Sequence, residues 1–203
     1  MIVVVDYGMG NLRSVSKAFE RSGFEVAVSS DPERVLRAAK LVVPGVGAFG
    51  DAMKELTKRG LVEPILAQIQ RGTPYLGICL GYQLLFEQSE EGGGCEGLCV
   101  FRGRVVRFPD WLRSKGLKVP QIGWNRVDFV RPSPIFAGLA SGTYFYFVHS
   151  YYPEPEEAIV AARTVYGVSF ASAIHSGNVF ATQFHPEKSQ AAGLKVIESF
   201  GRL

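Results

Sequence analysis

A single cysteine at the end of an apolar run is the clearest candidate for covalent chemistry in this sequence. The segment Tyr75–Gln83 reads YLGICLGYQ, with Gly77 and Gly81 each two residues from Cys79. This spacing is typical of a nucleophile elbow, a sharp turn from strand to helix that pushes one side chain out of the sheet and tolerates only small neighbours. We therefore predict that Cys79 is a nucleophile, and that the N-terminal dipole of the helix after it favours the thiolate.

Only one of the three histidines lies in a setting suited to proton transfer. His185 follows an apolar, strand-like run that starts at Val179, and Glu187 stands two residues later, beyond Pro186. A spacing of two places both side chains on one side of an extended chain, and the proline restricts the backbone between them. The carboxylate would orient the imidazole, so the sequence predicts Cys79, His185 and Glu187 as nucleophile, base and orienting acid.

The first half of the chain alternates short runs rich in valine, isoleucine and leucine with amphipathic stretches. We expect strands at 2–6, 24–28, 41–43 and 74–78, and helices at 11–22, 32–38, 49–71 and 80–88. This alternation predicts an α/β fold with a mostly parallel sheet flanked by helices. From 101 to 184, β-rich runs separated by turn residues predict antiparallel strands added to that sheet, before a closing helix at 189–200.

Composition limits the possible classes of protein. With 203 residues, of which 47% are hydrophobic and 20% charged, the chain suits one domain spanning 1–203. The net charge of +3 comes from scattered basic residues, so we expect no nucleic-acid partner. No apolar run is long enough for a membrane span, and the N-terminus lacks the basic lead of a signal peptide, which predicts a cytoplasmic protein. Cys95 and Cys99 have no second pair of ligands nearby, so we expect no metal site.

The segments GICLGYQ and FHPE resemble those of the class I glutamine amidotransferases, which hydrolyse the side-chain amide of glutamine through a cysteine thioester. Within that class, five segments resemble the glutaminase subunits of imidazole glycerol phosphate synthases, which serve histidine biosynthesis. These segments are Val3–Val15, Pro44–Met53, Pro120–Asn125, Phe145–Tyr152 and Gln183–Ser189. The resemblance implies a single flavodoxin-like amidotransferase domain that needs no metal or organic cofactor.

The resemblance also suggests how the reaction's oxyanion would be stabilised. The backbone N–H of Leu80, which follows the nucleophile, would be the first donor. Gly47, in the glycine-rich turn Pro44–Gly47, would supply the second. Because glycine-rich turns can reorient a peptide at low cost, we expect the Val46–Gly47 peptide to be misaligned until a partner binds.

Glutamine must be held at its α-amino and α-carboxylate groups. The resemblance assigns this role to Gly47, Gln83, Ser150 and Tyr151. His149, in the same aromatic run as Ser150, is expected to be a hydrogen-bonded core residue rather than a reactive group.

The partner implied by the resemblance is a (β/α)8 barrel cyclase, which takes up the ammonia in a heterodimer and forms imidazole glycerol phosphate and aminoimidazole carboxamide ribotide. The candidate docking residues are Gln121, Trp124, Asn125 and Lys188. Tryptophan beside glycine, in a segment opened by proline, suits a rigid interface anchor. No membrane partner is expected.

Three other interpretations stay open at this point. One is a class I glutaminase that serves pyridoxal phosphate or purine synthesis, which the opening DYGMGN disfavours. Another is an α/β-hydrolase with a cysteine nucleophile, although that fold places its acid before its histidine. The third is a partner module that keeps the fold without catalysis, against which the complete set of Cys79, His185 and Glu187 argues.

Overall fold

The first half of the chain builds the parallel part of a nine-stranded sheet. A computed structural model describes all of residues 1–203. The parallel strands are β1 Ile2–Val5, β2 Val26–Ser29, β3 Lys40–Gly45 and β4 Tyr75–Cys79. The helices between them are α1 Leu12–Arg21, α2 Pro32–Leu36, α3 Phe49–Lys58 and α4 Val62–Gln70. The strands and helices predicted up to residue 78 are therefore confirmed, with shifts at their ends.

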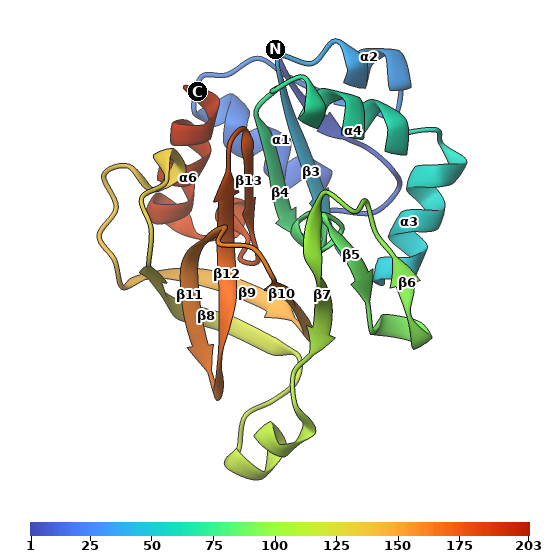
Figure 1. The fold of residues 1–203 in the computed structure, drawn as a ribbon. Helices are drawn as coiled ribbons and strands as arrows, with labels where there is room; N and C mark the ends of the chain where they lie inside the picture. Colours follow the sequence, from blue (N-terminus) through green and yellow to red (C-terminus); the bar gives the residue numbers. More distant parts are fainter.

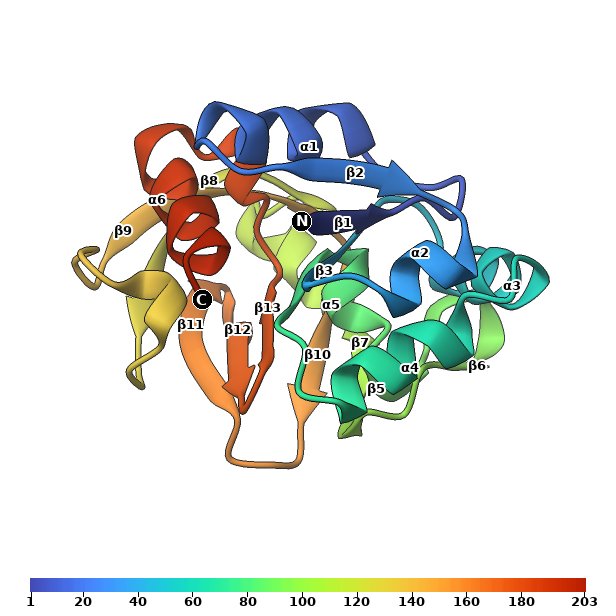
Figure 2. The ribbon, with the colours of Figure 1, turned by 90° about the horizontal axis from the view of Figure 1, so that it is seen from above.

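Both faces of this parallel sheet are covered, which explains why its strands are continuously apolar. Along β1, Ile2 and Val4 belong to one hydrophobic cluster, while Val3 and Val5 belong to the other. Successive strand residues point to opposite faces, so every residue of β1 is buried. Helices α1 and α6 (Gln190–Gly201) cover one face, and α2, α3 and α4 cover the other (Figure 2).

The second half adds antiparallel strands, as the sequence predicts. These are β8 Gln121–Phe129, β9 Thr143–His149, β11 Val160–Tyr166 and β12 Val168–Ser176, joined to the parallel part through β13 Val179–Thr182. Strand β13 runs parallel to β4 and pairs with it. Cys79, at the end of β4, therefore lies close to the residues that follow β13 and lead to His185. The sheet order is β2-β1-β3-β4-β13-β12-β11-β8-β9.

Four strands do not join this sheet, and here the prediction is corrected. Strands β5 Phe86–Ser89, β6 Cys95–Glu96, β7 Phe101–Arg107 and β10 Tyr151–Pro155 form a separate sheet in the order β10-β7-β5-β6 (Figure 1). Short 3₁₀ turns complete the chain: η1 Glu91–Gly93, η2 Asp110–Lys115, η3 Pro134–Phe136 and η4 Pro186–Lys188. No helix combines the length and the apolar character that crossing a membrane requires.

The predicted helix at 80–88 is wrong beyond its first turn. Helix α5 spans only Leu80–Gln83. The carbonyl oxygens of Leu84 and Leu85 accept hydrogen bonds from the N–H groups of Leu98, Val100 and Phe101, so the chain pairs with the second sheet instead of continuing the helix. A single turn has only a small dipole, so the helix contributes less to the thiolate than the sequence suggested.

Candidate active site

The predicted nucleophile stands at a strained turn between β4 and α5. Cys79 has φ 54° and ψ −105°, a combination that side-chain-bearing residues rarely adopt. Close packing requires both flanking glycines. A Cβ on Gly77 would lie 2.6 Å from the Gly81 carbonyl oxygen, and one on Gly81 would lie 1.7 Å from that of Val43. The turn therefore has the geometry of an elbow.

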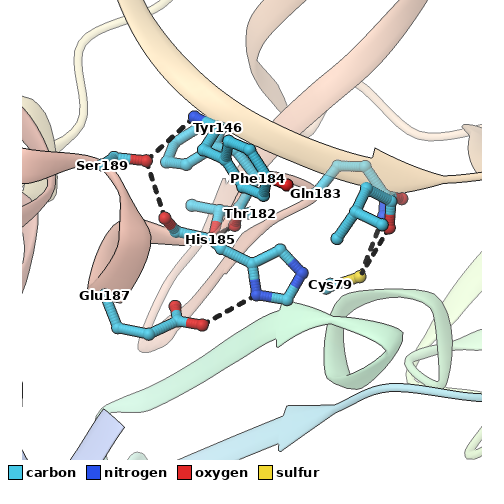
Figure 3. Close-up of polar contacts among 9 residues, drawn as sticks. Cys79, Tyr146, Thr182, Gln183, Phe184, His185, Glu187 and Ser189 are labelled. Carbon is cyan, nitrogen blue, oxygen red and sulfur yellow. Dashed lines mark hydrogen bonds and ion pairs between the residues drawn. The ribbon is translucent and has the colours of Figure 1, made fainter. Parts of the chain in front are cut away.

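The imidazole of His185 lies between Glu187 and Cys79 (Figure 3). Its Nδ1 is 2.8 Å from Oε1 of Glu187, and the two side chains are only 3% and 1% exposed. Its Nε2 has no hydrogen-bond partner and faces the Cys79 sulfur. The structure thus brings together the three side chains that two separate motifs predict.

The surroundings of His185 favour its charged form. Burial alone lowers the pKa of an imidazole, because it penalises the cation. Here the negative charge of the nearby Cys79 sulfur, together with the bound carboxylate of Glu187, outweighs burial and raises the pKa of His185 to about 10. His185 is therefore an imidazolium at neutral pH, beside the sulfur.

Two glutamines connect this site to the second sheet. Nε2 of Gln83 donates to the carbonyl oxygen of Tyr151 at 3.0 Å and to Oε1 of Gln183 at 3.2 Å. Nε2 of Gln183 in turn lies 3.6 Å from the Cys79 sulfur. Gln83 is among the site residues predicted from the sequence, whereas Gln183 is not. The only signal for Gln183 was a long polar residue in an otherwise apolar run.

A cavity of about 240 Å³ opens beside Cys79. Its walls include all the residues predicted for the oxyanion and for glutamine, which are Gly47, Leu80, Gln83, Ser150 and Tyr151. These residues come from three segments of the chain, the turn after β3, helix α5 and the junction of β9 with β10, and the fold gathers them at one end of the sheet.

Glu91, the only carboxylate on the cavity wall, is not among the site residues predicted from the sequence. Its Oε2 accepts a hydrogen bond from the Phe49 N–H at 2.7 Å, at the first residue of α3. Anions are stabilised at helix N-termini, so this contact fastens the glycine-rich segment 91–94 beside the turn that contains Gly47. One glutamate among several in a glycine-rich stretch carries no recognisable motif.

His149 is a buried core residue with both ring nitrogens in hydrogen bonds, in agreement with the prediction. Nδ1 is 2.8 Å from the Tyr151 carbonyl oxygen, and Nε2 is 3.1 Å from the side-chain amide of Gln121. Burial lowers its pKa to about 3. A neutral imidazole has one N–H, which must donate to the carbonyl, so Gln121 must present its amide N–H to Nε2.

Two of the predicted docking residues share an exposed face. Trp124 is 46% exposed and packs edge-on against the ring of Tyr146, at 6.2 Å between ring centroids. Nζ of Lys188 lies 5.9 Å above the same Tyr146 ring. Ile122 and Tyr144, 64% and 57% exposed, extend this face, which we call the aromatic face.

The other two predicted docking residues lie on the opposite side of β8. Side chains alternate along a strand, so Gln121 and Asn125 point away from Trp124. Gln121 is buried against His149, and the amide of Asn125 donates to the Val165 carbonyl oxygen at 3.0 Å. The predicted docking set is therefore split by the strand, and the side chain of Gln121 does not reach the surface.

The backbone of His185 is tied to β9 through a serine (Figure 3). The His185 N–H donates to the Tyr146 carbonyl oxygen at 2.9 Å. The Ser189 hydroxyl accepts from the Tyr146 N–H at 3.0 Å and donates to the His185 carbonyl oxygen at 2.6 Å. Serine at the first position before a helix ordinarily caps it, but Ser189 makes no such bond to α6.

The two remaining cysteines lie apart from this site. Cys95 is half-buried and Cys99 is exposed, and both are free thiols. Burial, followed by the nearby Glu96 and Glu87, raises the pKa of Cys99. Neither belongs to a group of three or more side chains that could ligate a metal ion.

Comparison with known proteins gives one family. The model of the class-I glutamine amidotransferases matches residues 3–201. Proteins named "Imidazole glycerol phosphate synthase subunit HisH" are similar over nearly the whole chain. That of Syntrophotalea carbinolica is 57% identical, covering 99% of this chain and 99% of its own. That of Aquifex aeolicus is 54% identical, covering 98% of this chain and 95% of its own.

Solved structures support the fold. A structure titled as a glutamine amidotransferase superimposes with a TM-score of 0.75 at 20% identity, covering all of both chains. A chain from the structure of PurLQS from Thermotoga maritima superimposes with a TM-score of 0.74 at 21% identity, covering 98% of this chain and 96% of that one. At such identities the likeness concerns the architecture alone.

Proposed function

The chain belongs to the class I glutamine amidotransferases, and from that membership we propose that it is the glutaminase subunit of an imidazole glycerol phosphate synthase. It hydrolyses the side-chain amide of glutamine to glutamate and ammonia, and the ammonia serves histidine biosynthesis. Relatives more than 50% identical over nearly their whole length carry that subunit name. The observation that carries the proposal is the meeting of Cys79, which lines the cavity, with His185 and Glu187 behind it.

In the proposed mechanism, Cys79 attacks the amide carbon of glutamine. The N–H groups of Leu80 and Gly47 stabilise the oxyanion, and His185 gives its proton to the departing ammonia. His185, now neutral, then takes a proton from water, and the resulting hydroxide cleaves the thioester to release glutamate. Glu187 holds the imidazole in one orientation and stabilises its cationic form throughout.

The cavity walls suggest how the amino-acid end of glutamine is held. Both amide hydrogens of Gln83 are already used, so its Oε1 is free to accept a hydrogen bond from the α-ammonium group. The carboxylate of Glu91 supplies a second acceptor for that cation. We assign the backbone around Ser150 and Tyr151 to the α-carboxylate.

The ammonia requires a partner subunit. In water at neutral pH, ammonia takes up a proton and loses its nucleophilicity, so it must pass directly to the acceptor. We propose a heterodimer with a (β/α)8 barrel cyclase docked on the aromatic face, where exposed Trp124, Tyr144 and Ile122 lie beside Lys188. We also propose a cytoplasmic location, which the free state of all three cysteines supports, and a single domain over residues 1–203.

The test is the rate of glutamate formation from glutamine by the purified chain, alone and with the cyclase and its nucleotide ligand. We expect a low rate alone, a rise of orders of magnitude in the complex, and loss of activity in Cys79→Ala. The exposed cysteine gives the matched control, because Cys99→Ala should keep the full rate. A rate that is insensitive to Cys79, or full without a partner, would contradict the proposal.

A further inference from the structure

We propose that Gln183 is a further catalytic residue, whose side-chain amide donates a hydrogen bond to the Cys79 sulfur and stabilises the thiolate, and that Gln83 fixes the orientation of that amide. This inference rests on the proposed function, in which Cys79 is the nucleophile. It concerns a side chain that the Cys79–His185–Glu187 arrangement does not include.

The orientation of Gln183 follows from its hydrogen bonds. An amide oxygen and nitrogen cannot be told apart by shape, so their partners must decide which is which. The Tyr151 carbonyl can only accept, so the Gln83 group beside it is the N–H donor. The same nitrogen faces Gln183, which must therefore present its oxygen to Gln83. The amide nitrogen of Gln183 then faces the sulfur, at 3.6 Å.

Burial makes this contact significant. Gln183 is fully buried and Gln83 is 5% exposed, so water does not satisfy their amides. The Cys79 sulfur is the only acceptor of the Gln183 amide nitrogen. A neutral thiol accepts weakly, whereas a thiolate accepts strongly, so this buried donor is fully satisfied only when Cys79 is ionised. Satisfying the amide and ionising the nucleophile therefore favour each other.

The sulfur has three polar neighbours: the imidazole of His185, the amide of Gln183 at 3.6 Å, and the Val148 carbonyl oxygen at 3.9 Å, which accepts only from the neutral thiol. His185 approaches from one side and exchanges its proton twice in each cycle. Gln183, two residues earlier in the same segment after β13, contacts the sulfur through an uncharged amide and keeps the same charge throughout. The sulfur is negative before attack and again when glutamate leaves, and the amide stabilises it at both moments without a proton transfer. No atoms or electrons move in this step beyond those of the proposed reaction.

The test is the pH dependence of Cys79 alkylation by iodoacetamide without glutamine, followed by mass spectrometry of the Cys79 peptide. The variant Gln183→Met keeps the length of the side chain but removes the donor. We expect its alkylation midpoint to move to higher pH and its kcat to fall about tenfold, the effect of one hydrogen bond to a charged group, with KM little changed. Gln83→Met should shift the midpoint the same way by less.

A buried glutamine far from the site provides the control. Gln68 is 3% exposed and donates to the Val35 carbonyl oxygen at 2.7 Å, so Gln68→Met removes a comparable hydrogen bond without changing the alkylation midpoint. The titratable groups around the sulfur are His185 with Glu187, Tyr7 near the end of β1, and His149, Glu91 and Tyr151 on the cavity wall. All of them are kept in every variant, so a change in midpoint reports the amide.

The outcomes separate this inference from the proposed function. If the wild-type chain forms glutamate but Gln183→Met has the wild-type midpoint, only the role of Gln183 is overturned. If the wild type forms no glutamate with its partner, the proposed function fails instead. Should Gln183→Met not fold, Gln183→Asn withdraws the same amide from the sulfur by one methylene, and an unshifted midpoint in it overturns the inference equally.

Discussion

Two buried histidines lie near Cys79, and at neutral pH one of them, His149, is uncharged while the other, His185, is a cation. His149 has 6% of its surface exposed and His185 has 2%, so burial is nearly the same. Burial lowers the pKa of His149 to about 3. Burial opposes the cation at His185 as well, but Cys79 and Glu187 raise the pKa of that residue to about 10. The neighbouring charges, rather than the degree of burial, decide which histidine is charged.

The partners also decide what each ring is free to do. Both nitrogens of His149 are bound to uncharged groups of Tyr151 and Gln121, which leaves no position for a reactant. Only Nδ1 of His185 is bound, to a carboxylate, and Nε2 is left facing the sulfur. A carboxylate on one nitrogen and an open second nitrogen are what an acid catalyst requires. Nearness to Cys79 is therefore not sufficient to make a histidine an acid catalyst, as His149 shows.

The largest effect should come from removing the two histidines in turn. We expect His185→Gln to lower kcat in the complex by about 10³-fold, within the range for loss of a general acid and base. His149→Gln should lower it only a few-fold, since an amide side chain can keep one of the two hydrogen bonds. Steady-state glutaminase assays with the cyclase present measure both. Equal losses in the two variants would contradict the distinction between them.

The next effect concerns the carboxylate. Glu187→Gln keeps the shape of the side chain, and we expect kcat to fall about 10²-fold because the imidazole loses its orientation and its counter-charge. Loss of the carboxylate also lowers the pKa of His185, so the imidazole gives up its proton at lower pH. The alkaline limb of the kcat/KM profile should therefore move to lower pH.

A pH profile of kcat/KM between pH 5 and 10 for Glu187→Gln checks this expectation. If the alkaline limb stays where it is in the wild type, Glu187 does not sustain the charge of His185. The difference between the two histidines would then have to come from Cys79 alone.

The chemistry of the site could be predicted from the sequence, because each of its parts is local. Gly77, Cys79 and Gly81 lie within one turn, and His185 and Glu187 lie within one segment, so spacing alone places their side chains. The contact of Gln183 with Cys79 joins residues 104 positions apart, and it depends on β13 pairing with β4. Spacing within a motif carries no information on such a pairing.

The errors in the predicted fold have the same origin. The residues after Gln83 have an apolar pattern suited to a helix, but Leu84 and Leu85 hydrogen-bond to the segment around Leu98 instead. The second sheet, and the burial of Gln121 against His149, likewise follow from partners distant in the sequence. Tertiary contacts override local preference at these positions.

A third prediction concerns stability in acid. His149 has a folded pKa of about 3, below its unfolded value of about 6.5. Its contribution is therefore complete above pH 6.5 and is lost as the pH falls toward 3, because only the unfolded chain takes up the proton. The raised pKa of His185 acts in the opposite direction between pH 7 and about 5.5, where the unfolded chain is only partly protonated at that residue, but this contribution is the same in the wild type and in His149→Gln and cancels in their difference.

Urea unfolding at a series of pH values between 7 and 4 measures this effect. We expect the wild type to lose more stability over this window than His149→Gln does, the difference corresponding to about one proton taken up on unfolding. Parallel stability curves for the two proteins would show that His149 is not held neutral in the folded state.

A fourth prediction gives His149 the kind of neighbour that His185 has, a carboxylate. Gln121→Glu places a carboxylate beside His149, in the relation that Glu187 has to His185. We expect the pKa of His149 to rise well above 3, because an adjacent negative charge favours the imidazolium. NMR titration of the imidazole C–H resonances measures this shift directly. No rise would mean that burial, rather than the partner, determines the charge of His149.

The smallest effect should come from the backbone that holds each ring. His149 lies within β9 and pairs with Gln121 of β8, whereas His185 follows the end of β13 and depends on Tyr146 and Ser189. We expect Ser189→Ala to destabilise the protein by about 1–2 kcal/mol, the cost of a buried hydrogen bond left unmade. It should also lower kcat in the complex a few-fold, with Ser189→Thr restoring both.

The comparison of kcat with stability decides what Ser189 does. The ring of Tyr146 belongs to the proposed docking surface, and the backbone of Tyr146 helps to position His185. Ser189 hydrogen-bonds to the backbones of both residues. If Ser189 positions His185, kcat falls at temperatures where the variant is fully folded, KM stays near the wild-type value, and stimulation by the cyclase weakens. If Ser189→Ala only unfolds more easily and keeps its full kcat in the complex, then the serine is structural. The position of His185 would in that case depend on the Tyr146 carbonyl and Glu187 alone.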